Sequence, residues 1–406
     1  MITLRSSRRD DDDALAATAA AAFKTPEPEN FVRFFREHSA RGPADTLIAE
    51  IGRKIAGHMS ALRLTMRFRG AELPFRGVSV VAVVPERRQL GVAERLLREH
   101  LRRLRAKGEP LSILYPFAIP FYQKHGWGVV EWIDALRLPP RALPPSPLRR
   151  NVRRLDLASD GLAMRGVYEQ ARERSNGFLV RDDYWWDRRV IGRASERMAY
   201  VDPERGLEGY LLYEVPSEPG YPGQHALVRE LVAATPAAAQ GLVGFLAALG
   251  EQFDEVELLR PRGDGPSLAR SPQLVTRDQH ELFRPICVTV SGAMARIADV
   301  PGALAAHPAA TGGSGRIGLD VSDPHLPRPL AFDVTLSSKG ARATPGSRHR
   351  DRLALSVDRL AQVYFGAARA SLLLEQGHAA GHPDAAARLD DAFAGPPLYL
   401  SRMNFF

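Results

Sequence analysis

Cysteine is almost absent from this chain, since Cys287 is the only one among 406 residues. A lone cysteine excludes an internal disulfide framework of the kind that holds small secreted domains together. The first residues, MITLRSSRRDDDD, reach charged side chains before any apolar stretch that a secretory signal peptide would need. These two features predict a cytoplasmic protein.

Long apolar runs and basic clusters are missing as well. The longest stretches low in charge, ALAATAAAAF and AAAQGLVGFLAALG, are shorter than the ~20 residues that a helix needs to cross a bilayer. The formal net charge is +8, from 55 Lys plus Arg against 47 Asp plus Glu, but basic and acidic residues are mixed and no basic run is interleaved with aromatics. We therefore expect neither a membrane nor a nucleic-acid partner.

Length and composition predict a globular protein of three units. Hydrophobic residues make up 45% of the 406 and charged residues 25%, and the chain exceeds the ~250–300 residues that one hydrophobic core usually serves. We expect the units to span 1–138, 152–285 and 286–406. Five prolines between 139 and 150 predict a linker over residues 139–151.

Strand and helix signals alternate in the first two units. In the first, the apolar strand GVSVVAVVP is followed by the amphipathic helix LGVAERLLREHLRRLRAKG, then by the strands LSILYPF and WGVVEWIDALRL. The second contains a helical YWWDRRVIG, the strands LEGYLLYEV and HALVRELVAA, a helix from Thr235 and the strand DEVELLRP. The sequence of the third unit predicts strands followed by a helical tail.

The turn between the strand and the long helix of the first unit has the chemistry of a phosphate site. In VVAVVPERRQLGVAERLL the strand ends at Pro85, and Arg88 to Ala93 lead into the helix. Free N–H groups and the helix dipole would then point at an anion. The alternative is a plain turn with surface arginines.

A very short helix is predicted in YPFAIPFYQKHGWG, from Tyr115 to Gly128. Pro120 suits a helix start and Gly126 suits a left-handed stop. A helix of ~6 residues cannot stand alone, so packing must fix the direction of Tyr122.

These residues resemble the GNAT N-acetyltransferases, whose acetyl-CoA motif Q/R-x-x-G-x-G/A follows their fourth strand. Together with the Pro-rich linker, the YWWDRRV segment and the final phenylalanine, the whole chain is similar to the Eis (enhanced intracellular survival) family. The resemblance implies an α/β fold with two GNAT-type mixed-sheet domains, the second degenerate, and a sterol-carrier-protein-like α+β domain. It also implies a homohexamer.

The resemblance further implies acetyl-CoA as co-substrate and no metal. The expected cofactor-binding residues are Val81, Ala82, Val83, Arg88, Gln89, Leu90, Gly91, Val92, Ala93, Phe117 and Ala118. The second unit has no arginine turn after VRELVAA, and we expect it to bind no CoA.

Attack of an amine on a thioester needs a base, a stabilised oxyanion and a proton for the leaving thiolate. The resemblance assigns the proton donor to Tyr122 and the base to the C-terminal carboxylate of Phe406. Either group could instead serve only in packing, and Lys124 and His125 are alternative bases.

The expected function is transfer of an acetyl group from acetyl-CoA to a primary amine of an aminoglycoside, a polyamine or a lysine side chain. The last residues, MNFF, carry no acidic side chain, which argues against multi-site acetylation of polycationic aminoglycosides. A non-catalytic module that binds acyl-CoA or a lipid is the alternative. For the third unit we favour structural support over lipid carriage.

Overall fold

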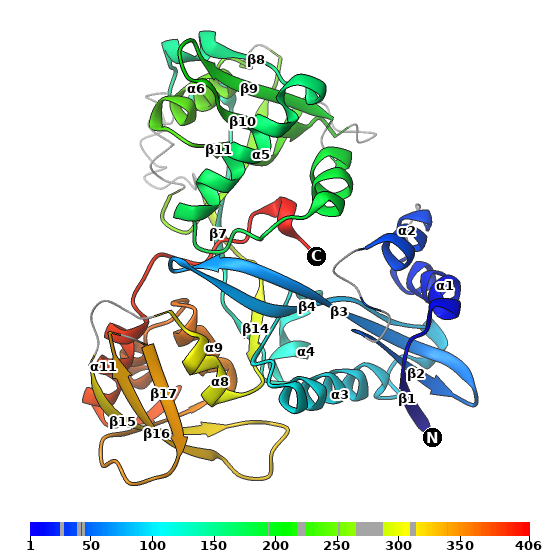
Figure 1. The fold of residues 1–406 in the computed structure, drawn as a ribbon, viewed down its shortest axis with the longest axis vertical. Coiled ribbons are helices and arrows are strands. Elements are labelled where there is room, and N and C mark those ends of the chain that lie inside the picture. Colours follow the sequence, from blue (N-terminus) through cyan, green and yellow to red (C-terminus); the bar gives the residue numbers. More distant parts are fainter. Residues whose placement is uncertain are drawn as a thin grey trace, which may run out of the picture.

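The computed structural model describes residues 1–24, 28–38, 42, 45–193, 195–216, 224–250, 252–264, 287–308, 314–338 and 340–406. Its described strands form two seven-stranded sheets and one five-stranded sheet, one for each unit (Figure 1). The C-terminus lies between the first and second units (Figure 1). None of the helices in the described ranges is long and apolar enough to cross a membrane.

The first sheet is mixed and has the order β1-β2-β3-β4-β5-β14-β6. Its strands are β1 (Ile2–Ser6), β2 (Thr46–Ile51), β3 (Lys54–Phe68), β4 (Ala71–Val83), β5 (Leu111–Leu114), β14 (Met294–Ile297) and β6 (Gly128–Val129). Its helices are α1 (Asp12–Phe23), α2 (Glu29–Glu37), α3 (Val92–Lys107) and α4 (Ile119–Gln123). α1 and α2 lie on one side of the strands and α3 on the other (Figure 1).

The second sheet has the order β13-β7-β12-β11-β10-β9-β8. Its strands are β8 (Val152–Arg154), β9 (Glu196–Asp202), β10 (Gly206–Glu214), β11 (His225–Ala233), β12 (Glu255–Pro261), β7 (Trp132–Leu138) and β13 (Val288–Ser291). Buried side chains of α5 (Leu157–Arg174) and α6 (Pro236–Ala247) belong to two different core clusters. The predicted helix from Thr235 is confirmed, with the Thr235 hydroxyl capping α6 through the N–H of Ala238 at 3.2 Å.

The third sheet has the order β17-β16-β15-β18-β19. Its strands are β15 (Gly315–Ser322), β16 (Leu330–Ser337), β17 (Gly340–Pro345), β18 (Arg352–Ser356) and β19 (Ala379–Gly381). Its helices are α8 (Val300–Ala306), α9 (Val357–Tyr364), α10 (Ala370–Glu375) and α11 (Pro383–Phe393). α9 packs on the first sheet, where the Gln362 amide donates to the Val129 carbonyl at 3.2 Å.

The first two sheets exchange strands. β7 was expected to end the first sheet, and that prediction is wrong because β7 pairs with β12 and β13 in the second sheet. β14 returns to the first sheet and lies between β5 and β6. The domain limits at 138, 151 and 285 stay predictions, and the last of them falls outside the described residues.

Two local expectations need adjustment. The proline-rich segment 139–151 contains short 3₁₀ turns at Pro140–Ala142 and Pro147–Asn151, and it packs on α6 with Leu143 fully buried. It is therefore part of the second unit's core as well as a connection. The helical YWWDRRVIG is a π-helical turn, η6 (Trp185–Val190), followed by a 3₁₀ turn.

Glu131 lies where the exchanged strands cross and where the end of the chain meets them. Its carboxylate accepts the N–H of Ala293 at 2.9 Å and that of Leu400 at 2.6 Å. Burial raises the pKa of Glu131 from 4.5 to about 7, although both N–H donors act in the opposite direction. The carboxyl group that links the exchanged strands to the chain end is therefore one whose ionisation destabilises the folded state.

Glu131→Gln should change how thermal stability depends on pH. Because the folded pKa lies above the unfolded one, the stabilisation is complete below about pH 4.5 and is lost as the pH rises through about 7. Relative to the Gln variant, the free energy of unfolding of the wild type should therefore fall by up to roughly 3 kcal/mol as the pH rises over this range. Melting temperatures of both proteins from pH 4 to 8 test this, and a constant difference would contradict it.

Candidate active site

The predicted phosphate turn forms the start of α3. Gly91 is the N-cap of this helix with φ at 76°, and Gln89 has φ at 63°. A Cβ added to Gly91 would meet no heavy atom within 4 Å, so its positive φ is what requires glycine there. The first N–H groups of α3, from Val92 onward, have no acceptor within the helix, and Val92, Ala93 and Glu94 line a cavity. The turn can therefore bind an anion.

A kink in β4 creates the second feature of the site. Val80 has φ at 49°, in a region that a β-branched residue rarely adopts. The pairing with β3 shifts here, because Ser79 faces Ser60 whereas Ala82 faces His58. Such a bulge leaves backbone groups unpaired beside the sheet. Sequence reasoning missed it, since valine is among the residues least expected at positive φ.

β4 also separates from its parallel neighbour. The two strands pair over only three residues each, Arg76–Val78 with Ser112–Leu114. Beyond this point β4 continues along the kink towards the phosphate turn, whereas β5 leads into α4. The opening between them lies at the carboxyl ends of the strands, where α/β sheets bind ligands.

A cavity of about 660 Å³ extends from this opening over the phosphate turn. The predicted cofactor residues that line it are Val81, Val83, Arg88, Gln89, Gly91, Val92, Ala93 and Phe117. The lining that sequence reasoning missed is Ala22, Phe23, Arg87, Glu94, Phe121 and Lys124. The turn thus faces a space bordered by the end of α1 and by the start of α4.

Three predicted cofactor residues are outside this lining, which consists of described residues. Ala82 is fully buried in the core behind β4, because successive strand residues point to opposite faces. Leu90 is 52% exposed at the tip of the turn. Ala118 is the N-cap of α4, and its side chain does not reach the cavity.

A second cavity of about 450 Å³ adjoins the first, and both are lined by Phe23, Val81 and Phe117. Its walls include Tyr122 together with the last two residues of the chain, Phe405 and Phe406. The remaining wall is mostly apolar and partly aromatic, and its described lining contains Arg189 but no Asp or Glu. The structure therefore brings the two predicted catalytic residues to one cavity.

Tyr122 is held by the aromatic packing that the short helix predicted. It is 2% exposed, and its ring lies 5.3 Å from that of Phe117 and 6.3 Å from that of Trp127, centre to centre. Burial raises the pKa of Tyr122 above its usual value. The hydroxyl therefore remains protonated at neutral pH and is able to donate.

The alternative bases are less well placed. His125 lines neither cavity and stacks on His325 of the third unit, with 5.2 Å between ring centres. Burial lowers the pKa of His125 to about 4. Lys124 lines the first cavity, where its Nζ lies 5.1 Å from the centre of the Phe121 ring.

The Phe406 side chain is tightly packed in the wall of the second cavity. It is 5% exposed, with its ring centre 5.7 Å from that of Phe75 and 5.4 Å from that of Tyr115. A Cβ added to Gly77 of β4 would lie 2.9 Å from this ring, so glycine makes room for it. The carbonyl of Phe405 accepts a hydrogen bond from Arg189 at 2.6 Å.

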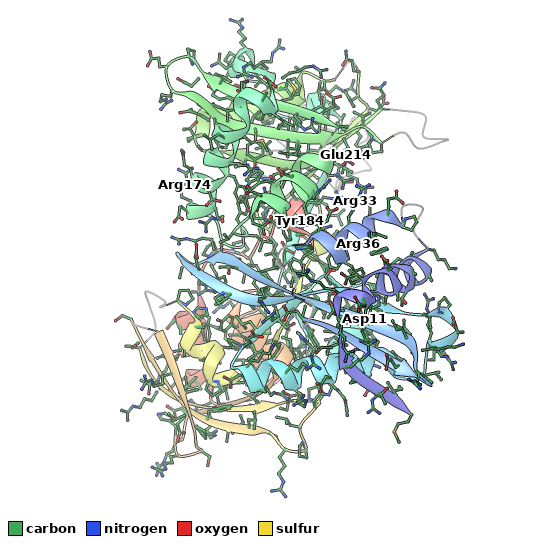
Figure 2. All side chains as sticks on the ribbon, turned by 45° about the vertical axis from the view of Figure 1, so that its right-hand side comes forward. Asp11, Arg33, Arg36, Arg174, Tyr184 and Glu214 are labelled. Atoms are coloured by element: carbon green, nitrogen blue, oxygen red, sulfur yellow. The ribbon has the colours of Figure 1, made fainter. Side chains whose placement is uncertain are left out.

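A further cavity of about 640 Å³ lies where α2 meets the second unit, and Figure 2 labels Arg33, Tyr184 and Glu214 from its lining. Two of its arginines pair with acidic side chains, Arg188 with Glu37 at 3.2 Å and Arg402 with Glu257 at 2.9 Å. Within the described ranges no group of three or more His, Cys, Asp or Glu is placed to hold a metal ion.

The three units match three known domain families. An acetyltransferase (GNAT) domain model matches residues 3–130, and a second model of the same description matches residues 177–297. A sterol carrier protein domain model matches residues 300–401. The predicted fold class, two GNAT-type domains followed by a sterol-carrier-protein-like domain, is therefore confirmed.

Relatives resemble the chain over most of its length. A Streptomyces avermitilis protein named as an uncharacterized N-acetyltransferase is 28% identical over 86% of this chain and 85% of its own. The N-acetyltransferase Eis of Mycobacterium tuberculosis is 26% identical over 74% of this chain and 73% of its own.

Solved structures share the fold throughout. A GCN5-related N-acetyltransferase from Anabaena variabilis superposes with a TM-score of 0.82 at 20% identity, covering 100% of both chains. Eis1 from Mycobacterium abscessus gives a TM-score of 0.76 at 20% identity over 98% of this chain and 99% of its own. The two GNAT matches, the sterol-carrier-like domain and the named relatives agree with the resemblance in the sequence: the chain is a GNAT acetyltransferase that is similar to the N-acetyltransferase Eis over most of its length.

Proposed function

We propose that this acetyl-CoA-dependent acetyltransferase carries the acetyl group directly to a primary amine that enters the second cavity. The observation that carries the proposal is the shared wall of Phe23, Val81 and Phe117 between the two cavities. A cofactor with its pyrophosphate on the Gly91 turn would follow β4 and present its thioester at this wall. The kinked backbone at Val80 supplies N–H groups for the acetyl carbonyl.

The chemistry assigned to the residues is direct attack. The amine nitrogen bonds to the acetyl carbon, the carbon–sulfur bond breaks, and Tyr122 gives its proton to the leaving thiolate. The Phe406 carboxylate takes a proton from the amine, directly or through water. Their common cavity supports this pair of roles.

The acceptor belongs to the primary amines, with aminoglycosides, polyamines and lysine side chains as the candidate classes. The aromatic lining with Arg189 offers no carboxylate to a polycation, which favours acceptors of low positive charge. A thiol-release assay with acetyl-CoA and a panel of the three classes tests the activity. Release with none of them, under conditions where acetyl-CoA binds, would contradict the proposal.

Three further expectations belong to the same proposal. Assembly as a homohexamer follows the family resemblance, and sedimentation of the 44.7 kDa chain tests it. A cytoplasmic location rests on the lone cysteine. The third unit supports the first through contacts such as those of Phe68, whose ring centre is 5.4 Å from that of His307 and 5.3 Å from that of Phe365.

Gly91→Val should raise the KM for acetyl-CoA by roughly 10-fold or more, because a β-branched residue at this positive φ distorts the turn. Gly108→Val is the matched control. Gly108 ends the same helix at φ 66° and lies outside both cavities, so its replacement strains the backbone without touching the cofactor. Equal KM values for the two variants would reject the turn as the pyrophosphate site.

Tyr122→Phe should lower kcat by ~10²-fold or more with little change in either KM, because the ring still packs and the proton donor alone is lost. Tyr364→Phe is the control, since Tyr364 is fully buried in the third unit and lines neither cavity. Steady-state rates of the wild type and both variants at pH 7 to 8 test this prediction. A Tyr122→Phe enzyme within about twofold of wild type would leave Tyr122 with a packing role.

A further inference from the structure

The second unit repeats the strand separation of the first. β11 and β12 pair in parallel over three residues each, His225–Leu227 with Glu255–Glu257, and then diverge. α6 follows β11 as α3 follows β4. The second unit therefore has an opening at the position where the first unit is proposed to hold acetyl-CoA.

That opening contains the chain's own end. A residual cavity of about 290 Å³ is lined by Val228 to Leu231 of β11 and Leu258 to Pro261 of β12, together with Pro396, Pro397, Tyr399 and Ser401. The Tyr399 hydroxyl donates to the carbonyl of Leu259 at 3.0 Å, a backbone group that a partner strand would otherwise bind. The terminal segment thus occupies the cleft.

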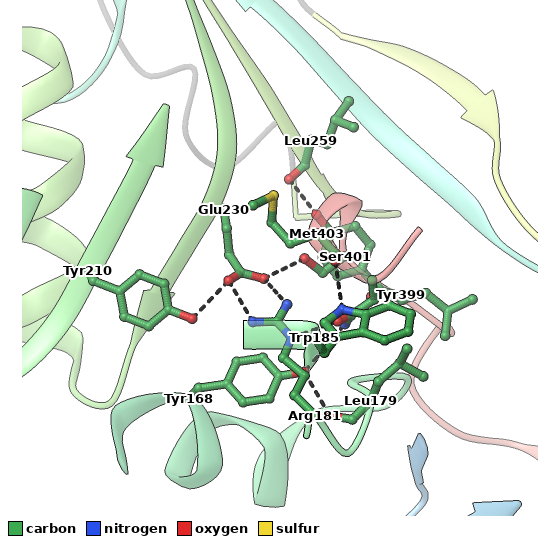
Figure 3. A network of polar contacts seen from close by, with 12 residues as sticks. Tyr168, Leu179, Arg181, Trp185, Tyr210, Glu230, Leu259, Tyr399, Ser401 and Met403 are labelled. Atoms are coloured by element: carbon green, nitrogen blue, oxygen red, sulfur yellow. Dashed lines mark hydrogen bonds and ion pairs between the residues drawn. The ribbon is translucent and has the colours of Figure 1, made fainter. Parts of the chain in front are cut away.

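A buried ion pair lies beneath this segment. The side chains of Arg181 and Glu230 are 0% and 2% exposed, and the guanidinium donates to both carboxylate oxygens at 3.0 and 2.6 Å (Figure 3). Glu230 also accepts the hydroxyls of Tyr210 and Ser401, each at 2.8 Å. The Nε–H of Arg181 donates to the side-chain oxygen of Asn404 at 2.8 Å.

The segment is thereby tied at successive residues up to the active-site cavity. The indole N–H of Trp185 donates to the carbonyl of Met403 at 3.0 Å (Figure 3). Ser401 has φ at 65°, a strained value for a residue other than glycine, which persists only where surrounding contacts impose it. Phe405 and Phe406 follow directly and enter the second cavity.

We propose that the second GNAT unit is a clamp for the chain end: its strand cleft holds residues 396–401, and Arg181 and Glu230 act as positioning residues that set Phe405 and Phe406 in the acceptor cavity. This inference rests on the proposed function for the role of the Phe406 carboxylate. A buried ion pair contributes little net stability because desolvation opposes it. The three further groups that hydrogen-bond to the pair, from Tyr210, Ser401 and Asn404, instead fix one geometry of the end, which is what a positioned base requires.

Ser401→Ala removes one hydrogen bond between the end and Glu230 and leaves the ion pair intact. Glu230→Gln removes the charge that organises the network. In the 406-residue chain, each variant should speed release of Phe406 by carboxypeptidase A by roughly 10-fold or more, since local opening exposes the end. Each should also lower kcat by roughly fivefold or more while the KM for acetyl-CoA stays unchanged.

Thr235→Ala is the matched control. The Thr235 hydroxyl donates to the carboxylate of Glu208 at 2.8 Å within the same unit, away from the chain end. This variant loses the cap of α6 and some stability, but Phe406 release and kcat should match wild type. A general loosening of the second unit is thereby separated from release of the end.

The two readouts separate the clamp from the proposed function. Unchanged Phe406 release in both network variants overturns the clamp, whatever the activity. Faster release with unchanged kcat overturns the positioning role, because the end would then be held without any consequence for the reaction. If Tyr122→Phe loses activity as well, acetyl transfer would depend on Tyr122 but not on the position of the Phe406 carboxylate.

Discussion

Parallel strands that pair briefly and then diverge leave backbone N–H and C=O groups without a strand partner, and such groups must find one elsewhere. This constraint operates twice in the chain, at β4 and β5 and again at β11 and β12. In the first unit the opening leads to a cavity over a glycine turn that suits an anionic cofactor. In the second unit the chain's own end enters the opening. On the proposed function, the same arrangement of strands serves one unit as the cofactor site and the other as the cleft that holds the end of the chain.

The three units also depend on one another for their packing. β7 and β14 exchange between the first two sheets, and α9 of the third unit packs on the edge of the first. A single buried cluster includes Leu15 of the first unit, Tyr168 of the second, Ile317 of the third, and Phe406. Separation of any unit would expose this core. The third unit also carries the chain from α11 back towards the second unit's cleft.

Local sequence signals predicted the local parts of this structure. Spacing that acts over a few residues predicts the strand before Pro85, the glycine turn, the short helix with Tyr122 and the amphipathic helix α3. The strand exchange depends on pairing between Trp132–Leu138 and residues more than a hundred positions away, which local periodicity does not report. The kink at Val80 opposes the residue's own preference and is imposed by tertiary packing. The contact of the chain end with Arg181 and Glu230 has no local signature, because a hydrophobic end indicates burial but not a partner.

The most direct test of the account moves the terminal carboxylate. Appending Gly-Ser after Phe406 places a peptide bond at the position of the carboxylate, whereas the same two residues added before Met1 do not alter the cavity. An α-carboxylate of pKa ~3.3–3.7 gains basicity when partly buried among aromatic rings. The account predicts that the C-terminal extension lowers kcat by at least ~10-fold, with the melting temperature and acetyl-CoA binding kept, and that the N-terminal extension has no effect. Equal turnover in the two extended proteins would contradict it.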